Sequence, residues 1–286
     1  MKYEFIAQHA REFSVQRMCK VLQVKRSGYY EWRRRSRSPG EKVEQELVKQ
    51  IKEAFRYSHE TYGSPRVHAL IRQNGVICGK NRVARLMQAN GIVAHRGRRR
   101  IPRTTQRRAG ARTAPNLLAQ NFQATAPNQK WVSDITYIDT AEGWLYLATV
   151  MDLYSRKIVG WAMAEKMESQ LGIDALDMAW RTRRRPLEVL HHSDQGSQYT
   201  SDAYQAYLSD RKFITSMSQR GNCYDNAAME SFFSTLKTEC ANGQFESRKK
   251  ARSEIFAYIE GWYNTRRIHS SLGYRSPAEF EENSGH

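Results

Sequence analysis

The sequence predicts an α/β domain, with a mixed sheet flanked by helices, preceded by an all-α basic region of helix-turn-helix units. Two observations lead to this prediction. From about residue 129 the pattern is that of three strands followed by alternating helix and strand, which is typical of a mixed sheet covered by helices. The chain of 286 residues also carries a net charge of +17, and all of this excess belongs to its first part.

The charge is distributed unevenly along the chain. Residues 1–113 contain 27 Lys and Arg against 8 Asp and Glu, a net charge of +19, whereas residues 114–286 have a net charge of −2. This asymmetry indicates a front region that binds a polyanion and a separate module behind it. A merely soluble basic surface is the alternative, but an excess of this size favours nucleic acid.

The composition excludes several classes of protein. At 40% hydrophobic residues the chain can bury a sizeable core. No apolar run approaches the ~18 residues of a membrane helix, and the sequence does not start like a signal peptide. The four cysteines lie far apart without C-x-x-C spacing, which favours free thiols in a reducing compartment over a structural zinc site. We expect a soluble, intracellular protein with no membrane partner.

Two helical hairpins are expected in the basic region. In the first, Ser14 can cap a helix, and a second short helix begins near Ser27 and leads into three arginines at 33–35. The apolar residues of the first helix recur at helical spacing: Val15, Met18, Cys19 and Leu22. A helix, a tight turn and a second basic helix form the helix-turn-helix outline.

The second hairpin starts at the turn 62–65, where Ser64 is expected to cap a helix and Pro65 to take its first position. This helix ends at Asn74-Gly75, and another covers 80–90. Its core-facing residues are Val67, Leu70, Ile71, Val83, Leu86 and Met87. Three basic side chains outside that stripe are predicted to bind DNA: Lys80, Arg82 and Arg85. Such hairpins are also common packing units, but two in succession on a basic chain indicate DNA binding.

A basic flexible linker is expected over 96–127. Residues 96–112 hold eight arginines and no acidic residue, without apolar periodicity. We predict that this segment becomes ordered on a DNA backbone, with Arg98, Arg99 and Arg100 among its contacts. A solvated linker without a partner is the alternative.

The back half is expected to contain five strands and their helices. Strands are predicted over 130–139, 145–152, 157–163, 187–192 and 212–216. The second and third of these are joined by the tight turn 154–156. Helices are predicted from about residue 169, over 202–210 and over 226–240, the last capped by Asp225.

Three carboxylates occupy core-facing elements of this half. Asp134 lies within the first strand, Asp194 lies just past the end of the fourth, and Glu230 shares a helix face with Ser234 and Lys237. Clustered carboxylates repel one another unless a cation neutralises them, and oxygen ligands suit Mg²⁺ or Mn²⁺. A metal site is therefore one interpretation, and three ordinary solvated acids are the other.

The segments around these acids resemble a known family. WVSDITYI, HHSDQGSQY and GNCYDNAAMESFFSTLKTE are similar to the three acidic blocks of the retroviral-integrase-like DDE catalytic core. They are most similar to those of bacterial insertion-sequence transposases encoded by two overlapping reading frames. The 35 residues between Asp194 and Glu230 match the family spacing, as do Gly196 and Lys237. YGSPRV and WYNTRRIHSSLGYRSPAEF extend the resemblance over nearly the whole chain.

The resemblance implies an RNase H-like core in which Asp134, Asp194 and Glu230 are catalytic and bind two Mg²⁺ ions, with Mn²⁺ as a substitute. It implies cleavage at transposon ends and attack of the freed 3′-hydroxyl on DNA. Lys237 would hold the terminal DNA backbone, unless it is a surface lysine. His192 and Asn226 would tune the site, although each residue is more often structural.

The resemblance also implies partners. The chain lacks a sustained heptad repeat, so it resembles either a second-frame product, which would act with a first-frame protein or as a fusion with it, or a protein of one frame. We expect transposon ends and target DNA as ligands, a homo-oligomer on DNA, and a location in the bacterial cytoplasm at the nucleoid. The late motif of Tyr263, Asn264, Arg267 and His269 is expected to serve architecture first and DNA contact second, ahead of a capping box at residues 276–279.

Five regions are expected: 1–60, the first helix-turn-helix; 61–95, the second; 96–127, the linker; 128–245, the catalytic core; and 246–286, a helical extension. Two other functions remain open. One is a non-catalytic regulator that occupies the element ends, and the other is a structure-selective nuclease on the same fold. The three acids favour catalysis over the regulator, and the two hairpins favour end recognition over the nuclease.

Overall fold

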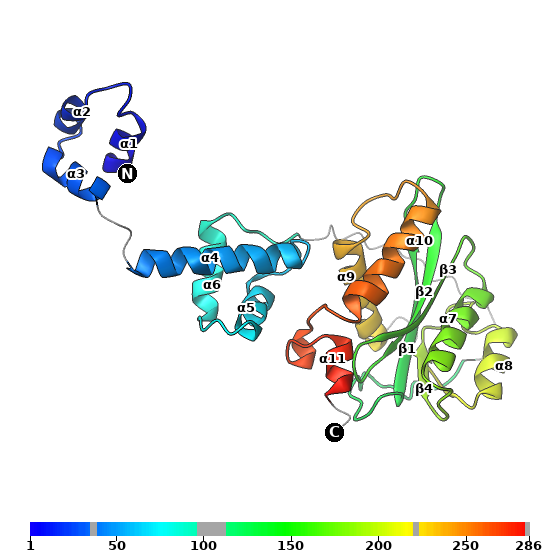
Figure 1. The fold of residues 1–286 in the computed structure, drawn as a ribbon. Coiled ribbons are helices and arrows are strands. Elements are labelled where there is room, and N and C mark those ends of the chain that lie inside the picture. The colour runs from blue at the N-terminus through cyan, green and yellow to red at the C-terminus, as the bar shows by residue number, and fades with distance from the viewer. Residues whose placement is uncertain (35–38, 96–112, 220–222, 284–286) are drawn as a thin grey trace. The chain divides into compact units, whose positions relative to one another are not determined.

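The computed structural model describes residues 1–34, 39–95, 113–219 and 223–283. The chain forms two compact units, Met1–Glu53 and Ala54–His286 (Figure 1). Within the described ranges, no helix combines the length and the apolar character that a membrane span requires.

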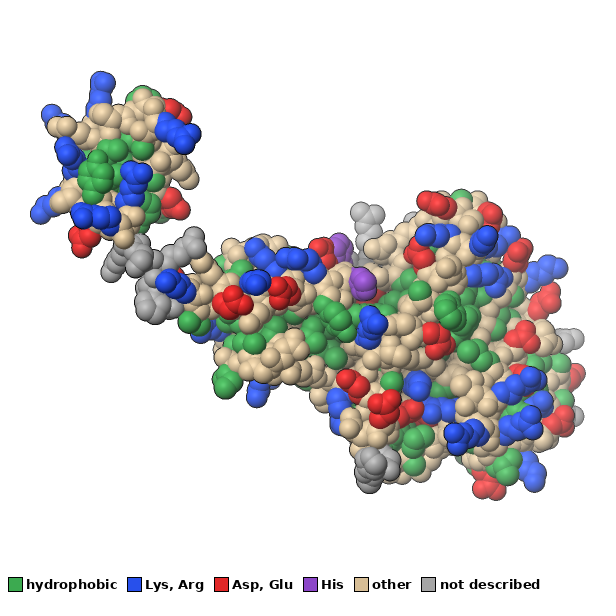
Figure 2. Space-filling view, viewed as in Figure 1, with side chains coloured by type: hydrophobic (Ala, Val, Ile, Leu, Met, Phe, Trp, Pro, Cys, Tyr) green, Lys and Arg blue, Asp and Glu red, His purple; other side chains and the backbone are tan. Residues whose placement is uncertain are grey.

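The first unit is a small helical body. Its elements are α1 (Lys2–Gln8), α2 (Val15–Val21), α3 (Arg26–Arg34) and the first part of α4 (Pro39–Tyr57). The hydroxyl of Ser14 accepts a hydrogen bond from the backbone N–H of Arg17, which confirms the predicted cap. Ile6, Met18, Cys19 and Tyr29 form its core. Figure 2 shows Lys and Arg side chains around the surface of this unit. The sequence pattern did not predict α1 or α4.

In the second unit, the last part of α4 is followed by the second predicted hairpin, α5 (Ser64–Gln73) and α6 (Lys80–Ala89). Five of the predicted core residues are buried: Val67, Ile71, Val83, Leu86 and Met87. The predicted cap at Ser64 is wrong, because Gly63 is the N-cap residue. The carbonyl of Gly63 accepts hydrogen bonds from the N–H groups of Arg66 and Val67, so the helix starts one residue earlier than expected.

A five-stranded mixed sheet forms the centre of the second unit. Its strands lie in the order β3-β2-β1-β4-β5. β1 pairs antiparallel with β2 and parallel with β4, β2 pairs antiparallel with β3, and β4 pairs parallel with β5. The strand bounds are β1 (Lys130–Ile138), β2 (Leu145–Asp152), β3 (Ile158–Ala164), β4 (Leu190–Ser193) and β5 (Ile214–Met217). β1, β2 and β3 agree with the predicted strands to within one residue, because β-branched and aromatic residues favour strands, whereas β4 and β5 start three and two residues later than predicted.

Helices cover both faces of the sheet (Figure 1). On one face lie α7 (Ser169–Thr182) and α8 (Asp202–Asp210), whose apolar residues form the main core together with Trp131, Ala148 and Val150. Gly160 of β3 allows this close packing, because a Cβ atom there would lie 2.2 Å from the carbonyl oxygen of Ala175. On the other face lie α9 (Ala227–Glu239) and α10 (Arg248–Phe256).

The start of α9 differs from the prediction. Asp225 belongs to the 3₁₀ turn η1 (Cys223–Asn226), and the N-cap residue of α9 is Asn226, without a side-chain cap hydrogen bond. The carboxylate of Asp225 instead accepts hydrogen bonds from the Asn116 amide and the Gln219 N–H. The predicted Asp225 cap is therefore wrong, because these more distant donors compete for the same carboxylate.

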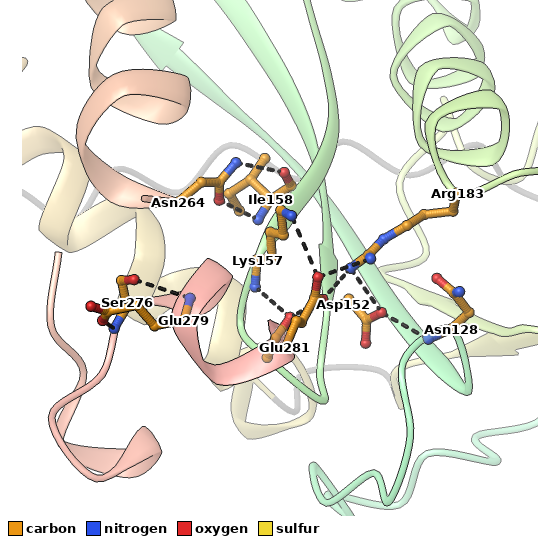
Figure 3. Close-up of polar contacts among 10 residues, drawn as sticks. Asn128, Asp152, Lys157, Ile158, Arg183, Asn264, Ser276, Glu279 and Glu281 are labelled. Carbon is orange, nitrogen blue, oxygen red and sulfur yellow. Dashed lines mark hydrogen bonds and ion pairs between the residues drawn. The ribbon is translucent and has the colours of Figure 1, made fainter. Parts of the chain in front are cut away.

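The C-terminal extension packs on the core. It continues from α10 through the π-helical segment η2 (Ala257–Tyr263) and the 3₁₀ turn η3 (Ser270–Leu272) to α11 (Pro277–Glu282). Ser276 and Glu279 form the predicted capping box of α11, with Pro277 in its first turn (Figure 3). The side-chain amide of Asn264 donates to the carbonyl of Ile158 and accepts from its N–H, both at 2.9 Å.

Candidate active site

Strand pairing brings Asp134 and Asp194 together. In the parallel pair of β1 and β4, Val132 is the partner of His192. Asp134 and Asp194 each lie two residues further along, so their side chains leave the sheet on the same face. Asp194 directly follows the end of β4, at the carboxyl edge where ligands of α/β sheets bind.

The two carboxyl groups influence each other strongly. Burial, the neighbouring Asp194 and Glu230 raise the pKa of Asp134 to about 8, against the opposing effects of the Ile135 N–H and Lys237. Burial also raises the pKa of Asp194. A pair of partly buried acids with raised pKa values is costly in the ionised form and is characteristic of functional sites.

The loop after β4 holds Asp194 in place. The N–H of Gly196 donates a hydrogen bond of 2.9 Å to Oδ1 of Asp194. A Cβ atom at Gly196 would lie 2.9 Å from that same oxygen and 3.1 Å from Oε1 of Gln198. A larger residue here would therefore displace the carboxylate of Asp194.

Glu230 lies on α9, exposed, on the sheet face that carries Asp134. It is near enough to raise the pKa of Asp134. Among the described residues, however, no three Asp, Glu, His or Cys side chains are grouped closely enough to form a complete metal cage. The structure thus brings Asp134 and Asp194 together and leaves Glu230 on the adjacent helix. Repulsion between like charges favours this separation.

The donors present are suited to a divalent cation. The three acidic side chains offer only oxygen atoms, the ligand type that Mg²⁺ and Mn²⁺ prefer. Thr149 is the direct β2 partner of Asp134, and its buried hydroxyl has no hydrogen-bond partner among the described residues. Burial first, and then the neighbouring carboxylates, raise the pKa of Asp134, and a bound cation would oppose this rise.

Lys237 lies on the same helix as Glu230. Its ammonium group lies over the ring of Tyr137, at 4.3 Å from the ring centre. Burial lowers the pKa of Lys237, while Asp134 raises it. The structure therefore places one cation between α9 and the strand that carries Asp134.

His192 and Asn226 are both buried near this site. Nδ1 of His192 lies 2.8 Å from the hydroxyl of Ser216, and burial lowers its pKa to about 4. Among the described atoms, Nε2 of His192 and Oδ1 of Asn226 have no hydrogen-bond partner. Sequence reasoning did not identify Ser216, which also accepts hydrogen bonds from the N–H groups of Leu117 and Leu118.

The predicted DNA contacts other than Lys237 fall into two groups. Lys80, Arg82 and Arg85 are exposed on α6, away from its buried stripe. Arg98, Arg99 and Arg100, with most of the linker, lie outside the described residues.

The C-terminal motif has mainly structural contacts. The guanidinium group of Arg267 forms a bidentate ion pair with Glu239 at 2.8–3.0 Å, both side chains being buried. Tyr258 and Trp262 donate to the same carboxylate. Together with the Asn264 contact to Ile158 (Figure 3), this supports the expectation of an architectural role. Glu239 was not identified from the sequence, because only the fold places it beside Arg267.

Comparisons with known proteins agree with this architecture. Residues 124–223 and 211–277 each match a family model described as an integrase core domain, and residues 42–100 match an HTH-like domain. The chain is 46% identical to the transposase InsF of insertion sequence IS3A from Escherichia coli K12 over 284 residues, which is 98% of each chain. The chain belongs to the IS3 family of transposases. It is also 45% identical to an uncharacterized 31 kDa protein of insertion element IS600 from Shigella sonnei, over 93% of this chain and 97% of that protein.

The family assignment confirms the predicted fold class. An IS3-family transposase is a DNA-binding protein, and this one has helix-turn-helix-like helices ahead of an RNase H-like integrase core. Among solved structures, the catalytic core of HTLV-2 integrase in complex with magnesium is 16% identical, with a TM-score of 0.41 over 56% of this chain and 99% of that chain.

Proposed function

We propose that this transposase cuts DNA at the ends of its insertion sequence and joins the freed 3′-hydroxyl to target DNA as a polynucleotidyl transferase of the DDE type. The proposal depends chiefly on one observation. Asp134 and Asp194 lie side by side at the carboxyl edge of the sheet, and Glu230 lies on the helix that covers the same face.

Asp134, Asp194 and Glu230 are the residues that would hold two Mg²⁺ or Mn²⁺ ions. When bound, such ions lower the pKa of an attacking water or hydroxyl and stabilise the leaving oxygen. The oxygen-only donor set and the raised pKa of Asp134 support this assignment. No covalent protein–DNA intermediate is needed, so the chemistry requires no serine or tyrosine nucleophile.

The protein's own residues position the reactants. The Gly196 N–H holds Asp194 at the edge of the sheet. Lys237, held over Tyr137, is suited to bind the phosphate backbone at the transposon end. Lys80, Arg82, Arg85 and the three arginines at 98–100 would neutralise phosphates beyond the cleaved bond and add salt-dependent affinity.

We further propose the division of labour expected from the sequence, with two helical DNA-binding regions (1–60 and 61–95), a basic linker (96–127), the catalytic core (128–245) and the helical extension (246–286). A first-frame protein or fusion partner, and assembly of several copies on DNA, would complete the active complex. Such a complex would act in the bacterial cytoplasm, at the nucleoid.

The test compares Asp134→Asn, Asp194→Asn and Glu230→Gln with the unaltered chain on DNA that carries the element ends, in the presence of Mg²⁺. Asp210→Asn, an exposed acid at the end of α8, is the matched control. We expect each of the three variants to lose cleavage and joining by at least about 100-fold while end binding is retained. Full cleavage by any one of them contradicts the assignment. End binding without cleavage by the unaltered chain, alone and with its first-frame partner, would indicate a regulator instead.

A further inference from the structure

A cavity of about 370 Å³ lies beside α9 in the second unit, on a different face of that helix from Glu230. Ala227, Ser231 and Thr235 line it at intervals of four residues. Glu230 precedes Ser231 by one position, which turns it by about 100° around the helix axis. The proposed catalytic residue and the cavity therefore share one rigid helix.

Three arginines from distant parts of the chain meet at this cavity. Arg66 comes from α5, Arg156 from the turn between β2 and β3, and Arg267 from the segment after η2. Two of them belong to the YGSPRV and WYNTRRIHSSLGY segments, for which the catalytic site provides no role. Three guanidinium groups thus line one cavity.

The positive charge is only partly balanced. Glu239 is committed to its bidentate ion pair with Arg267. Within the described part of the chain, neither Arg66 nor Arg156 forms an ion pair with a carboxylate, and burial lowers the pKa of both guanidinium groups. Because arginine stays charged in proteins, two partly buried cations without a counter-ion favour the binding of an anion.

The remaining polar groups also suit an anion. His269 lines the cavity, and its Nε2 atom is buried without a hydrogen-bond partner among the described residues. Burial and the three arginines lower the pKa of His269 to about 2, so the unliganded imidazole is neutral and one of its nitrogens carries a donor hydrogen. Ser231, Ser270 and Ser271 are exposed at the cavity and offer hydroxyl donors.

The arrangement of the donors selects among anions. A planar carboxylate is satisfied by one guanidinium group, as Glu239 is by Arg267. Donors from three separate elements instead suit a tetrahedral group, whose oxygens point in different directions. Ala227 and Ala228 in the first turn of α9 line the cavity, so the positive end of the helix dipole also favours an anion there.

We propose that this cavity binds a phosphate group of DNA and thereby anchors the strand next to the helix that carries Glu230. The inference rests on the proposed function, because it assumes that the DNA processed at the carboxylates runs along α9. The cavity has room for the phosphate and part of its adjoining sugar. It is distinct from the backbone contact assigned to Lys237, which lies over Tyr137.

The test uses the full chain without divalent metal, so that binding is measured apart from cleavage. Arg156→Gln and Arg66→Gln each remove one cavity cation. Arg184→Gln is the matched control, because Arg184 is exposed, does not line the cavity, and has a left-handed backbone (φ 61°) like that of Arg156 (φ 62°). Two probes are compared by calorimetry and by salt-dependent binding: inorganic phosphate and a duplex that carries the element end.

We expect inorganic phosphate to bind the unaltered chain and the Arg184→Gln control, and to bind each cavity variant at least tenfold more weakly. We also expect each cavity variant to reduce the slope of log K against log salt for the duplex by about 0.9, the value for one phosphate contact. An unchanged slope for the duplex overturns the proposal. If inorganic phosphate still binds, the cavity is a site for the free ion only. If inorganic phosphate does not bind either, the cavity binds no anion.

The result is separable from the fate of the proposed function. If Asp134→Asn and Glu230→Gln retained cleavage, the catalytic assignment would fail whatever the cavity binds. If these variants lose cleavage while Arg156→Gln keeps the full salt dependence, only the phosphate cavity fails.

Discussion

The ammonium group of Lys237 lies 4.3 Å from the centre of the Tyr137 ring. Tyr137 is three residues beyond Asp134 on β1, and Lys237 is seven residues beyond Glu230 on α9. The contact therefore joins two of the three segments that carry proposed catalytic carboxylates. A partly desolvated cation–π contact of this kind stabilises the folded protein by about 1 kcal/mol.

Replacing Lys237 with glutamine should reduce cleavage at the element ends by about tenfold or more, because a backbone contact near the carboxylates is lost. Tyr137→Leu should have a smaller effect, since the lysine remains but is held less firmly. Lys249→Gln, which removes an exposed lysine on α10, is the control. Rates of end cleavage measure all three. Equal rates for Lys237→Gln and Lys249→Gln would refute a DNA-positioning role.

The raised pKa of Asp134 predicts a pH-dependent gain in stability for Asp134→Asn. The folded-state pKa of about 8 exceeds the ordinary value of 3.8, so the folded protein binds more protons between these limits. The stability of the metal-free protein therefore falls as the pH rises through this range. The asparagine variant lacks this penalty and should therefore be more stable than the unaltered chain at pH 8.

Thermal unfolding at pH 5 and pH 8 checks this expectation. The advantage of Asp134→Asn over the unaltered chain should shrink at the lower pH, and Asp210→Asn should show no such trend. Added Mg²⁺ should raise the Tm of the unaltered chain but not that of Asp134→Asn, because only the former keeps the ligand. A pH-independent difference between the two chains would argue against a strained carboxylate pair.

Gly196→Ala should displace Asp194. The added Cβ atom would lie 2.9 Å from the Oδ1 atom that the Gly196 N–H holds, so the carboxylate must move. We expect cleavage to fall by about tenfold or more with little change in DNA binding. Gly243→Ala is the control, because a Cβ atom there meets no atom within 4 Å. Normal cleavage by Gly196→Ala would mean that the loop tolerates the shift and does not set the position of Asp194.

The ion-pair cluster around Glu281 of α11 should stabilise the folded protein (Figure 3). Glu281 accepts hydrogen bonds from Arg183 and Ser155, and Arg183 also pairs with the fully buried Asp152. Arg183→Met should cost about 3–5 kcal/mol, since it leaves Asp152 buried without its cation. Denaturant unfolding measures the loss, with Arg184→Met as the control.

Glu281→Gln should cost less, and its cost should depend on pH. Burial alone would raise the pKa of Glu281, but hydrogen bonds from Arg183 and Ser155 hold it below its ordinary value of 4.5. The carboxylate thus stabilises the fold above that pH and loses this contribution as the pH falls through the lowered value. The loss of stability caused by Glu281→Gln should therefore decrease in acid. The substitution Glu282→Gln, at an exposed position, should cause no loss of stability. If the loss of stability caused by Glu281→Gln did not change with pH, the charge of Glu281 would not be its cause.

The exposed basic residues of α6 should contribute to salt-dependent DNA affinity. Replacing Lys80, Arg82 and Arg85 together with glutamine should reduce the salt slope of duplex binding by about 2–3, because each phosphate contact contributes ~0.9. The matched triple variant Arg181→Gln, Arg184→Gln and Arg185→Gln removes the same charge from the end of α7. Equal losses in the two triple variants would point to net charge rather than to recognition by α6.

Much of the local structure could be predicted from the sequence. The strand over residues 145–152 has the predicted bounds, since β-branched and aromatic residues in a buried run determine a strand locally. The buried stripe of α6 follows in the same way from helical periodicity. Caps were less predictable. Ser64 and Asp225 are good capping residues by type, but the helix at Ser64 starts one residue earlier than expected, and the Asp225 carboxylate accepts hydrogen bonds from Asn116 and Gln219 instead.

The sequence by itself determined the α/β class, the basic front region and the three carboxylates, because periodicity, charge and spacing are properties of neighbouring residues. Only the tertiary structure decided which distant groups meet. Parallel pairing of β1 with β4 brings Asp134 beside Asp194, and chain folding brings Arg66 and Arg156 to one cavity with His269. The burial that raises the pKa of Asp134, like that which keeps His269 neutral, comes from residues far apart in the chain, so no local pattern contains it.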